Sequence, residues 1–130
     1  MAGCARWAIA ALGCAALWYA AGCRKPTETS PSVAIAPEIA PWPAGVGAAT
    51  VTLRISDAGG HAVSGARVTL EADMSHAGMR PEFGEARETA AGRYQGRLAF
   101  TMAGDWVVLM HVTLAGGRKL ERQMDVKGVR

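Results

Sequence analysis

Cysteine is scarce in this chain, and its placement excludes two kinds of feature. The 130 residues contain three cysteines, Cys4, Cys14 and Cys23, all near the N-terminus. The residues after Cys23 can therefore form no disulfide among themselves and offer no cysteine nucleophile. Their stability must come from a hydrophobic core, and the length allows about one domain with such a core.

A strong charge of one sign is also missing. The formal net charge of +3 results from 14 Lys and Arg against 11 Asp and Glu, spread along the chain. Nucleic-acid-binding domains gather basic residues into a stripe with aromatic side chains between them. The two short basic pairs, Arg24-Lys25 and Arg118-Lys119, form no such stripe. We therefore expect no nucleic-acid partner.

Recognisable catalytic motifs are absent as well. The sequence has no nucleophile elbow, no phosphate-binding loop and no helical His-Glu zinc pair. Glu82, Glu85 and Glu88 come nearest to paired acids, but Arg80 and Arg87 accompany them on a polar stretch that is typical of a solvated edge. We expect no enzymatic activity.

The N-terminal 22 residues have the three parts of a secretory leader: a basic start at Arg6, an apolar stretch from Trp7 to Tyr19, and small residues after it. The apolar stretch is too short to span a bilayer, which takes about 20 residues. The run Ala20-Ala21-Gly22-Cys23 resembles the lipobox of bacterial lipoprotein precursors, although Ala stands where Leu is commonest. The resemblance implies that Cys23 is lipidated and becomes the mature N-terminus. A rival match that ends at Cys14 leaves too short an apolar region before it.

A lipid on Cys23 would hold the chain at the cell envelope, facing the periplasm, with the membrane as its partner. Residues 23–43 are rich in proline, which predicts an extended tether that forms no β-ladder. The folded domain is then expected to occupy residues 44–130.

Beyond Gly45, apolar and polar residues alternate, and this period of two predicts β-strands. Glycine-containing turn signals separate the strands, and no segment after the leader has a helical period. We predict an all-β domain, a small antiparallel sandwich in which Trp106 is a core anchor. The expected strands are 50–56, 67–73, 93–101, 106–114 and 120–126, with a weaker one at 85–89.

The direction of successive strands predicts which loops share an end of the sandwich. If 85–89 is a strand, the 74–84 loop and Met102 lie at one end, and His61 lies at the other. If 85–89 is only a loop, Met102 moves to the opposite end.

The run Met74-Ser75-His76-Ala77-Gly78-Met79 concentrates two thioethers and one imidazole, a soft ligand set that suits Cu(I). Residues 74 and 76 of an extended segment project to the same side, about 6.5 Å apart. Gly78 could let the chain fold back so that Met79 joins them, and Met102 could be a fourth donor.

A plainer interpretation stays open. Met74 continues the inward phase of the preceding strand and could simply fill the core, while His76 could be an exposed loop residue. The other two histidines are weaker candidates: His111 falls on the face opposite Trp106, and His61 follows a glycine pair in a turn.

The chain also resembles the YtkA-like family of small envelope-exposed β-sandwich domains, which is related to FixH. The matching residues are 74–79, 92–94 and 100–106, and the resemblance extends over about residues 48–126. It implies an immunoglobulin-like sandwich of about six to seven strands. It also implies roles that include copper handling and maturation of copper-containing oxidases, with Met74, His76, Met79 and Met102 as candidate ligands. FixH proteins keep a transmembrane anchor, which a lipoprotein leader replaces in this chain.

Two hypotheses follow for the function. The first is a lipid-anchored binding module that captures Cu(I) and passes it to an acceptor. The alternative is a metal-free interaction or structural domain that holds an envelope protein partner.

Overall fold

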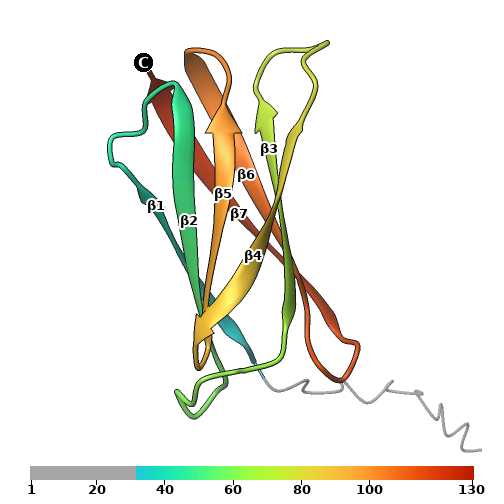
Figure 1. Ribbon diagram of the computed structural model, residues 1–130. Coiled ribbons are helices and arrows are strands. Elements are labelled where there is room, and N and C mark those ends of the chain that lie inside the picture. Colours follow the sequence, from blue (N-terminus) through green and yellow to red (C-terminus); the bar gives the residue numbers. More distant parts are fainter. Residues whose placement is uncertain (1–31) are drawn as a thin grey trace, which may run out of the picture.

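The structure is a computed structural model that describes residues 32–130, and these residues form seven antiparallel strands and no helix (Figure 1). The predicted all-β class is confirmed. The strands are β1 (Ala34–Ala40), β2 (Gly47–Ser56), β3 (Arg67–Met74), β4 (Glu82–Ala90), β5 (Arg93–Phe100), β6 (Gly104–Thr113) and β7 (Lys119–Val129).

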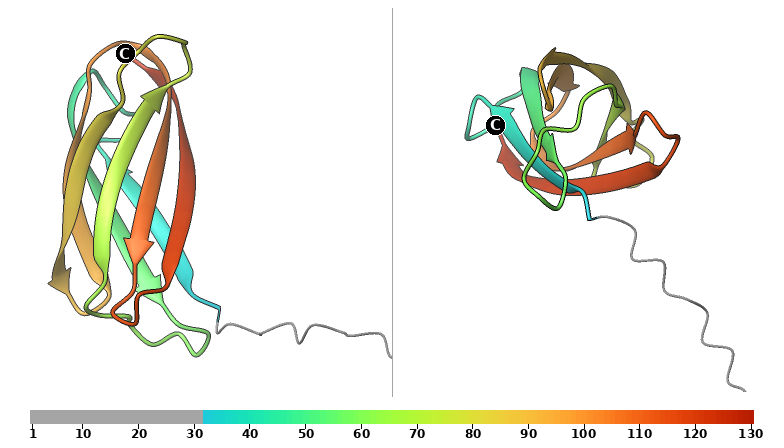
Figure 2. Two further views of the ribbon diagram at one scale, coloured as in Figure 1. Left: turned by 90° about the vertical axis from the view of Figure 1, so that its right-hand side faces the viewer. Right: turned by 90° about the horizontal axis from the view of Figure 1, so that it is seen from below.

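The strands follow the order β1-β2-β5-β4-β3-β6-β7 in one continuous sheet. Strand β4 makes the connection between the two halves: its residues 82–86 pair with β3, and its residues 86–90 pair with β5. Seen from below, the sheet wraps around a central core and brings β1 and β7 to the same side (Figure 2). The result is a small immunoglobulin-like sandwich in which β4 pairs with both halves of the sheet.

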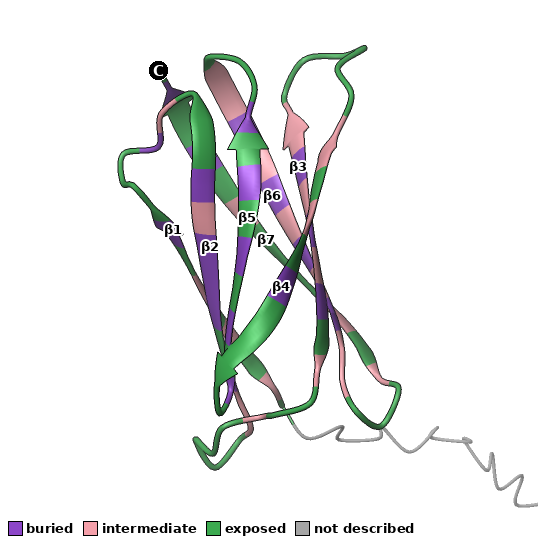
Figure 3. Cartoon of the chain, in the orientation of Figure 1, coloured by how far each residue is buried: buried purple, intermediate pink, exposed green. Residues whose placement is uncertain are grey.

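The alternating sequence pattern explains the core. Every second residue of β5 and β6 is buried, and the residues between them are partly or fully exposed (Figure 3). Trp106 is fully buried and its ring lies 5.4 Å from that of Phe100, in a tilted arrangement, so the predicted core anchor is confirmed. The other large side chains with less than 2% exposure include Tyr94, Leu53, Ile55, Leu70 and Met110.

Two glycines allow β4 to cross closely over β5. A Cβ atom on Gly84 would collide with the carbonyl oxygen of Arg97, and one on Gly96 would collide with that of Glu85. Both neighbours are backbone atoms, which cannot swing aside as a flexible side chain can. Glycine is therefore needed at both positions for β4 to approach β5 this closely.

Residues 34–40 correct the sequence interpretation, which assigned them to a tether unable to form a ladder. They form β1, which pairs with β2 from Ala34 opposite Ser56 to Ala40 opposite Thr50. The ladder tolerates Pro37 because β1 is an edge strand, where a missing N–H on the outer side costs no sheet hydrogen bond. The sheet therefore begins ten residues before the expected boundary at residue 44. The expected leader, Cys23 and the first part of the tether lie outside the described residues.

Within the described part of the chain, no helix is long and apolar enough to cross a membrane.

Candidate functional site

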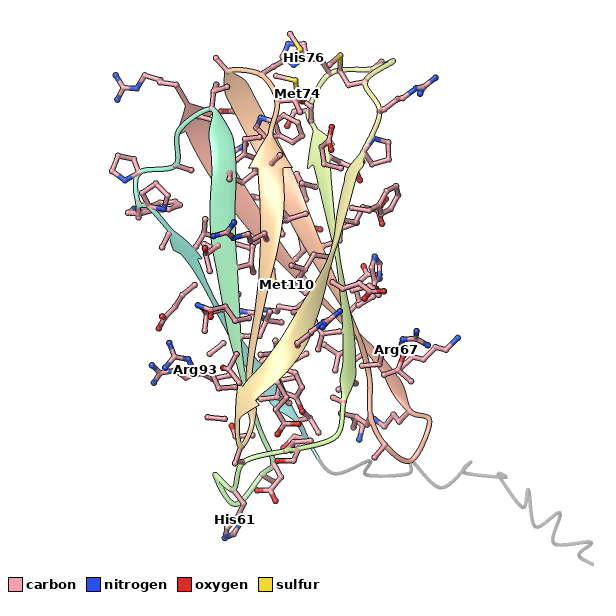
Figure 4. The ribbon with its side chains drawn as sticks, viewed as in Figure 1. His61, Arg67, Met74, His76, Arg93 and Met110 are labelled. Carbon is pink, nitrogen blue, oxygen red and sulfur yellow. The ribbon has the colours of Figure 1, made fainter. Side chains whose placement is uncertain are left out.

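The candidate ligands come from two loops at one end of the sandwich, which we call the rim. We define the rim as Met74, the last residue of β3, with residues 75–81, which connect β3 to β4, and residues 101–103, which connect β5 to β6. Because 82–90 is a strand, β5 runs toward the same end as β3, and Met102 joins the loop that carries Met79. The predicted sharing of one end is confirmed, as is the position of His61 at the opposite end (Figure 4).

Hydrogen bonds fix both rim loops to the start of β6. The backbone N–H of Ser75 donates to the carbonyl oxygen of Asp105 at 3.0 Å. The indole Nε1 of Trp106 donates to the carbonyl oxygen of Met102, also at 3.0 Å. Since Trp106 is anchored in the core, the chain near Met102 is held by a fully buried ring. The loops that carry Met74, His76 and Met102 are therefore attached to one common strand.

Met74 lies between the core and the rim. It is the last residue of β3, is partly buried, and packs against the hydrophobic core. Its terminal methyl group would lie 2.7 Å from a Cβ atom on Gly104, so the absence of a side chain at that glycine makes room for the thioether. In Figure 4, Met74 and His76 lie together at the upper end, whereas Met110 lies within the body of the sandwich. Met74 thus fills space at the top of the core, as the plainer interpretation expected, and it does so beside His76.

The remaining donors are open to solvent. Met79 is 38% exposed and Met102 is 48% exposed, and His76 is exposed as well. Two exposed methionines at the same end of the sandwich leave apolar, polarisable side chains in water, where a soft metal ion or an apolar partner could contact them.

Asp105 adds a negative charge close to these donors. Its pKa is held below the usual range, chiefly because its carboxylate accepts the backbone N–H of Gly128 at 2.9 Å. Lys127, whose Nζ lies 3.6 Å from the carboxylate, and His76 lower that pKa further. The ionised carboxylate of Asp105 therefore places a negative charge near the rim, which would favour a cation bound there.

The other two histidines have structural partners. His111 lies on the outer face of β6, where its Nε2 is 3.0 Å from Glu71 and its Nδ1 is 3.1 Å from Glu121. His61 lies in the turn after β2, and its backbone N–H donates to Asp57 at 2.9 Å. Neither lies at the rim. Among the described residues, no group of three or more His, Cys, Asp or Glu side chains is arranged to hold a metal ion, so a metal site at the rim depends on its methionines.

Sequence reasoning missed the roles of two polar residues. Glu88 belongs to the stretch interpreted as a solvated edge, but its carboxylate accepts the backbone N–H of Gly65 at 2.9 Å and of Gly92 at 3.4 Å. The first of these bonds is the main cause of the lowered pKa of Glu88. Tyr94 binds the same connection from inside the core. The only signal for either role was the glycine content of the turns.

The fold and the two fixed loops define a small, seven-stranded immunoglobulin-like domain with a methionine-bearing rim. A family model described as YtkA-like matches residues 32–111, which is more than half of the chain, so the protein belongs to the YtkA-like family. The match begins just before β1 and ends within β6, and it therefore includes both rim loops. No curated protein and no solved structure matches the chain.

Proposed function

We propose that this protein is an extracytoplasmic binding module that captures Cu(I) at its rim and passes it to an acceptor. Met74, His76, Met79 and Met102 are the proposed ligands. Thioethers and a neutral imidazole bind Cu(I) without first losing a proton, and soft donors favour this ion over harder divalent metals. The observation that carries the proposal is the Ser75–Asp105 hydrogen bond, which fixes the histidine-bearing loop to the strand that follows Met102.

A membrane anchor at Cys23 completes the proposal. The described chain enters the domain at the start of β1, and β1 begins at the end opposite the rim (Figure 1). An N-terminal lipid would therefore leave the rim pointing away from the membrane, where a soluble metal donor or acceptor can reach it. The lipobox-like sequence before Cys23 supports the anchor.

Anaerobic titration with Cu(I) against a competing chelator tests the metal site. The fragment 32–130 suits this experiment because it contains all seven described strands and the hydrophobic core that they enclose, from Ile39 to Val129. It also lacks the three cysteines, which would bind Cu(I) themselves. Its fold is first confirmed by circular dichroism and a cooperative thermal transition.

The expected result is a single tight site that loses about tenfold or more in affinity in each of His76→Ala and Met79→Ala. Matched controls are His61→Ala, a histidine at the opposite end, and Met124→Leu, a methionine on β7; both should bind Cu(I) as the unchanged fragment does. Equal affinity in all five proteins would remove the copper proposal.

The alternative is a metal-free domain that holds an envelope protein through the same end. The exposure of apolar side chains there favours it: Trp42 is 61% exposed and Val46 is 51% exposed, both in the β1–β2 connection beside the rim. Under this alternative the purified fragment binds no Cu(I). Crosslinking in cells then captures the same identified partner whether or not Met74 and His76 are replaced by Ala.

A further inference from the structure

Positively charged residues lie together at the end of the domain that is opposite the rim. We call this end the base. We define the base as the 57–66 connection, the 91–92 turn and the 114–118 turn, with the strand residues that border them. The strands β3, β5 and β7 all rise from this end, and their first residues are Arg67, Arg93 and Lys119. Arg54, two residues before the end of β2, adds a fourth cation and Arg118 a fifth.

The acidic residues at the base are occupied by other groups. The carboxylate of Asp57 accepts the backbone N–H groups of Gly59 and His61, each at 2.9 Å, and lies 3.3 Å from the imidazole of His61. Glu88 accepts the backbone N–H groups of the two glycines described above. Within residues 32–130, Arg54, Arg67, Arg93 and Lys119 have no carboxylate within ion-pair distance.

One pair of these cations is placed unfavourably within the sheet. Arg54 and Arg93 are directly opposite each other in the β2–β5 ladder, and both are exposed. Like charges in this arrangement destabilise a sheet unless something neutralises them. An anion between the two guanidinium groups would remove the repulsion, and guanidinium groups bind phosphate through two parallel hydrogen bonds.

A depression of about 400 Å³ lies beside this pair. Arg54 and Arg93 border it, and the small residues Ser56, Gly60, Ala62, Ala90, Ala91 and Gly92 line it. Paired cations over a shallow apolar lining match the chemistry of a lipid headgroup, in which a charged phosphate adjoins an apolar glycerol and acyl region.

We propose that the base is a docking surface for anionic phospholipid, with Arg54 and Arg93 holding a headgroup phosphate and Arg67 and Lys119 lying against neighbouring headgroups. The chain enters β1 beside this surface, since Ala34 pairs with Ser56. The orientation rests on the proposed anchor. From Cys23 to Ala34 the chain reaches at most about 40 Å, so an anchored domain would keep its base near the bilayer.

Sedimentation with lipid vesicles tests the surface without the anchor. The fragment 32–130 is mixed with vesicles of phosphatidylcholine alone, or of phosphatidylcholine with phosphatidylglycerol, at low salt and at about 0.5 M salt. We expect binding to the anionic vesicles only, and loss of that binding at the higher salt. The double variant Arg54→Gln/Arg93→Gln should bind about 30-fold more weakly, because each cation near an anionic surface contributes about 1 kcal/mol.

The matched control is Arg80→Gln/Arg130→Gln, which removes the same charge from the opposite end and should bind as the unchanged fragment does. The proposal is overturned if the unchanged fragment ignores anionic vesicles, or if the control loses as much binding as the base variant. It is also overturned if ultracentrifugation without lipid shows a dimer that the base variant abolishes, because the base would then contact a second copy. The anchor itself is tested separately, so its failure and the failure of this surface can be told apart.

Discussion

The hydroxyl of Tyr94 holds the longest described connection against the core. It donates to the carbonyl oxygen of Val63 at 2.8 Å and accepts the backbone N–H of Ala66 at 3.1 Å. The ring is fully buried, and this burial is the main cause of its raised pKa. A neutral hydroxyl therefore satisfies two backbone groups of the connection between β2 and β3.

Replacing Tyr94 with Phe keeps the ring and removes both hydrogen bonds. We expect the free energy of unfolding to fall by about 1–3 kcal/mol, because a partly buried donor and a partly buried acceptor lose their partner. Urea denaturation of fragment 32–130 measures the change. Thr89→Ala is the control: its exposed hydroxyl makes one long bond of 3.4 Å to Arg93, and its loss should cost less than about 0.5 kcal/mol. An unchanged midpoint for Tyr94→Phe would contradict the role assigned to the hydroxyl.

At this scale the sequence predicted residue environments better than residue partners. Trp106 was recognised as a core residue and His111 as a surface residue because each follows directly from the phase of its strand. The partners of Glu88 could not be predicted, since Gly65 precedes it by 23 residues and the turn that brings them together leaves no periodic signal.

The strands show a similar division. Those from β2 to β7 were predicted, the weak one at 85–89 included. The alternation that predicts a strand is clear in the burial of β3, β5 and β6, whereas β4 buries only Ala86. Strand β1 was missed, since its proline and alanines resemble a linker, and only the register with β2 makes it part of the sheet. The partners of β4 could not be predicted from the sequence either. A strand that pairs with β3 at one end and with β5 at the other has the same local pattern as any other strand.

Removing β1 tests whether it belongs to the folded unit. We expect a fragment of residues 44–130 to be less stable than fragment 32–130 by about 2 kcal/mol or more, because Ile39 is only 6% exposed and the edge of β2 would lose its partner. Urea denaturation of the two fragments measures the difference. Ile39→Ala in the longer fragment separates the buried side chain from the strand pairing. Equal stability of the two fragments would show that β1 does not contribute to the stability of the domain.

The whole molecule has two chemically different ends. Soft donors and exposed apolar side chains lie at the rim. Arg54, Arg67, Arg93 and Lys119, which have no carboxylate within ion-pair distance among the described residues, lie at the base, where the described chain begins. The two proposals use opposite ends and therefore do not compete. A domain docked on lipid through its base would present its rim to the surrounding solution.

The proposed anchor makes a prediction at this scale. Expressed in a bacterium that processes lipoproteins, the full chain should fractionate with membranes and incorporate labelled palmitate, whereas Cys23→Ser should incorporate none and move into the soluble fraction. Cys14→Ser is the control and should behave as the unchanged chain does. Labelling that survives Cys23→Ser would show that the lipobox assignment is wrong.

The sequence alone determined the all-β class and the faces of most strands, because a period of two fixes which side of a strand is buried. It left open the end at which Met102 lies, because that depended on whether residues 85–89 form a strand, and the structure decided that they do. Only the tertiary structure decided that β1 joins the sheet, that β4 links its two halves, and that cations from separate strands gather at the base. These features depend on contacts between residues that are distant in the sequence, and such contacts have no local pattern from which they could be inferred.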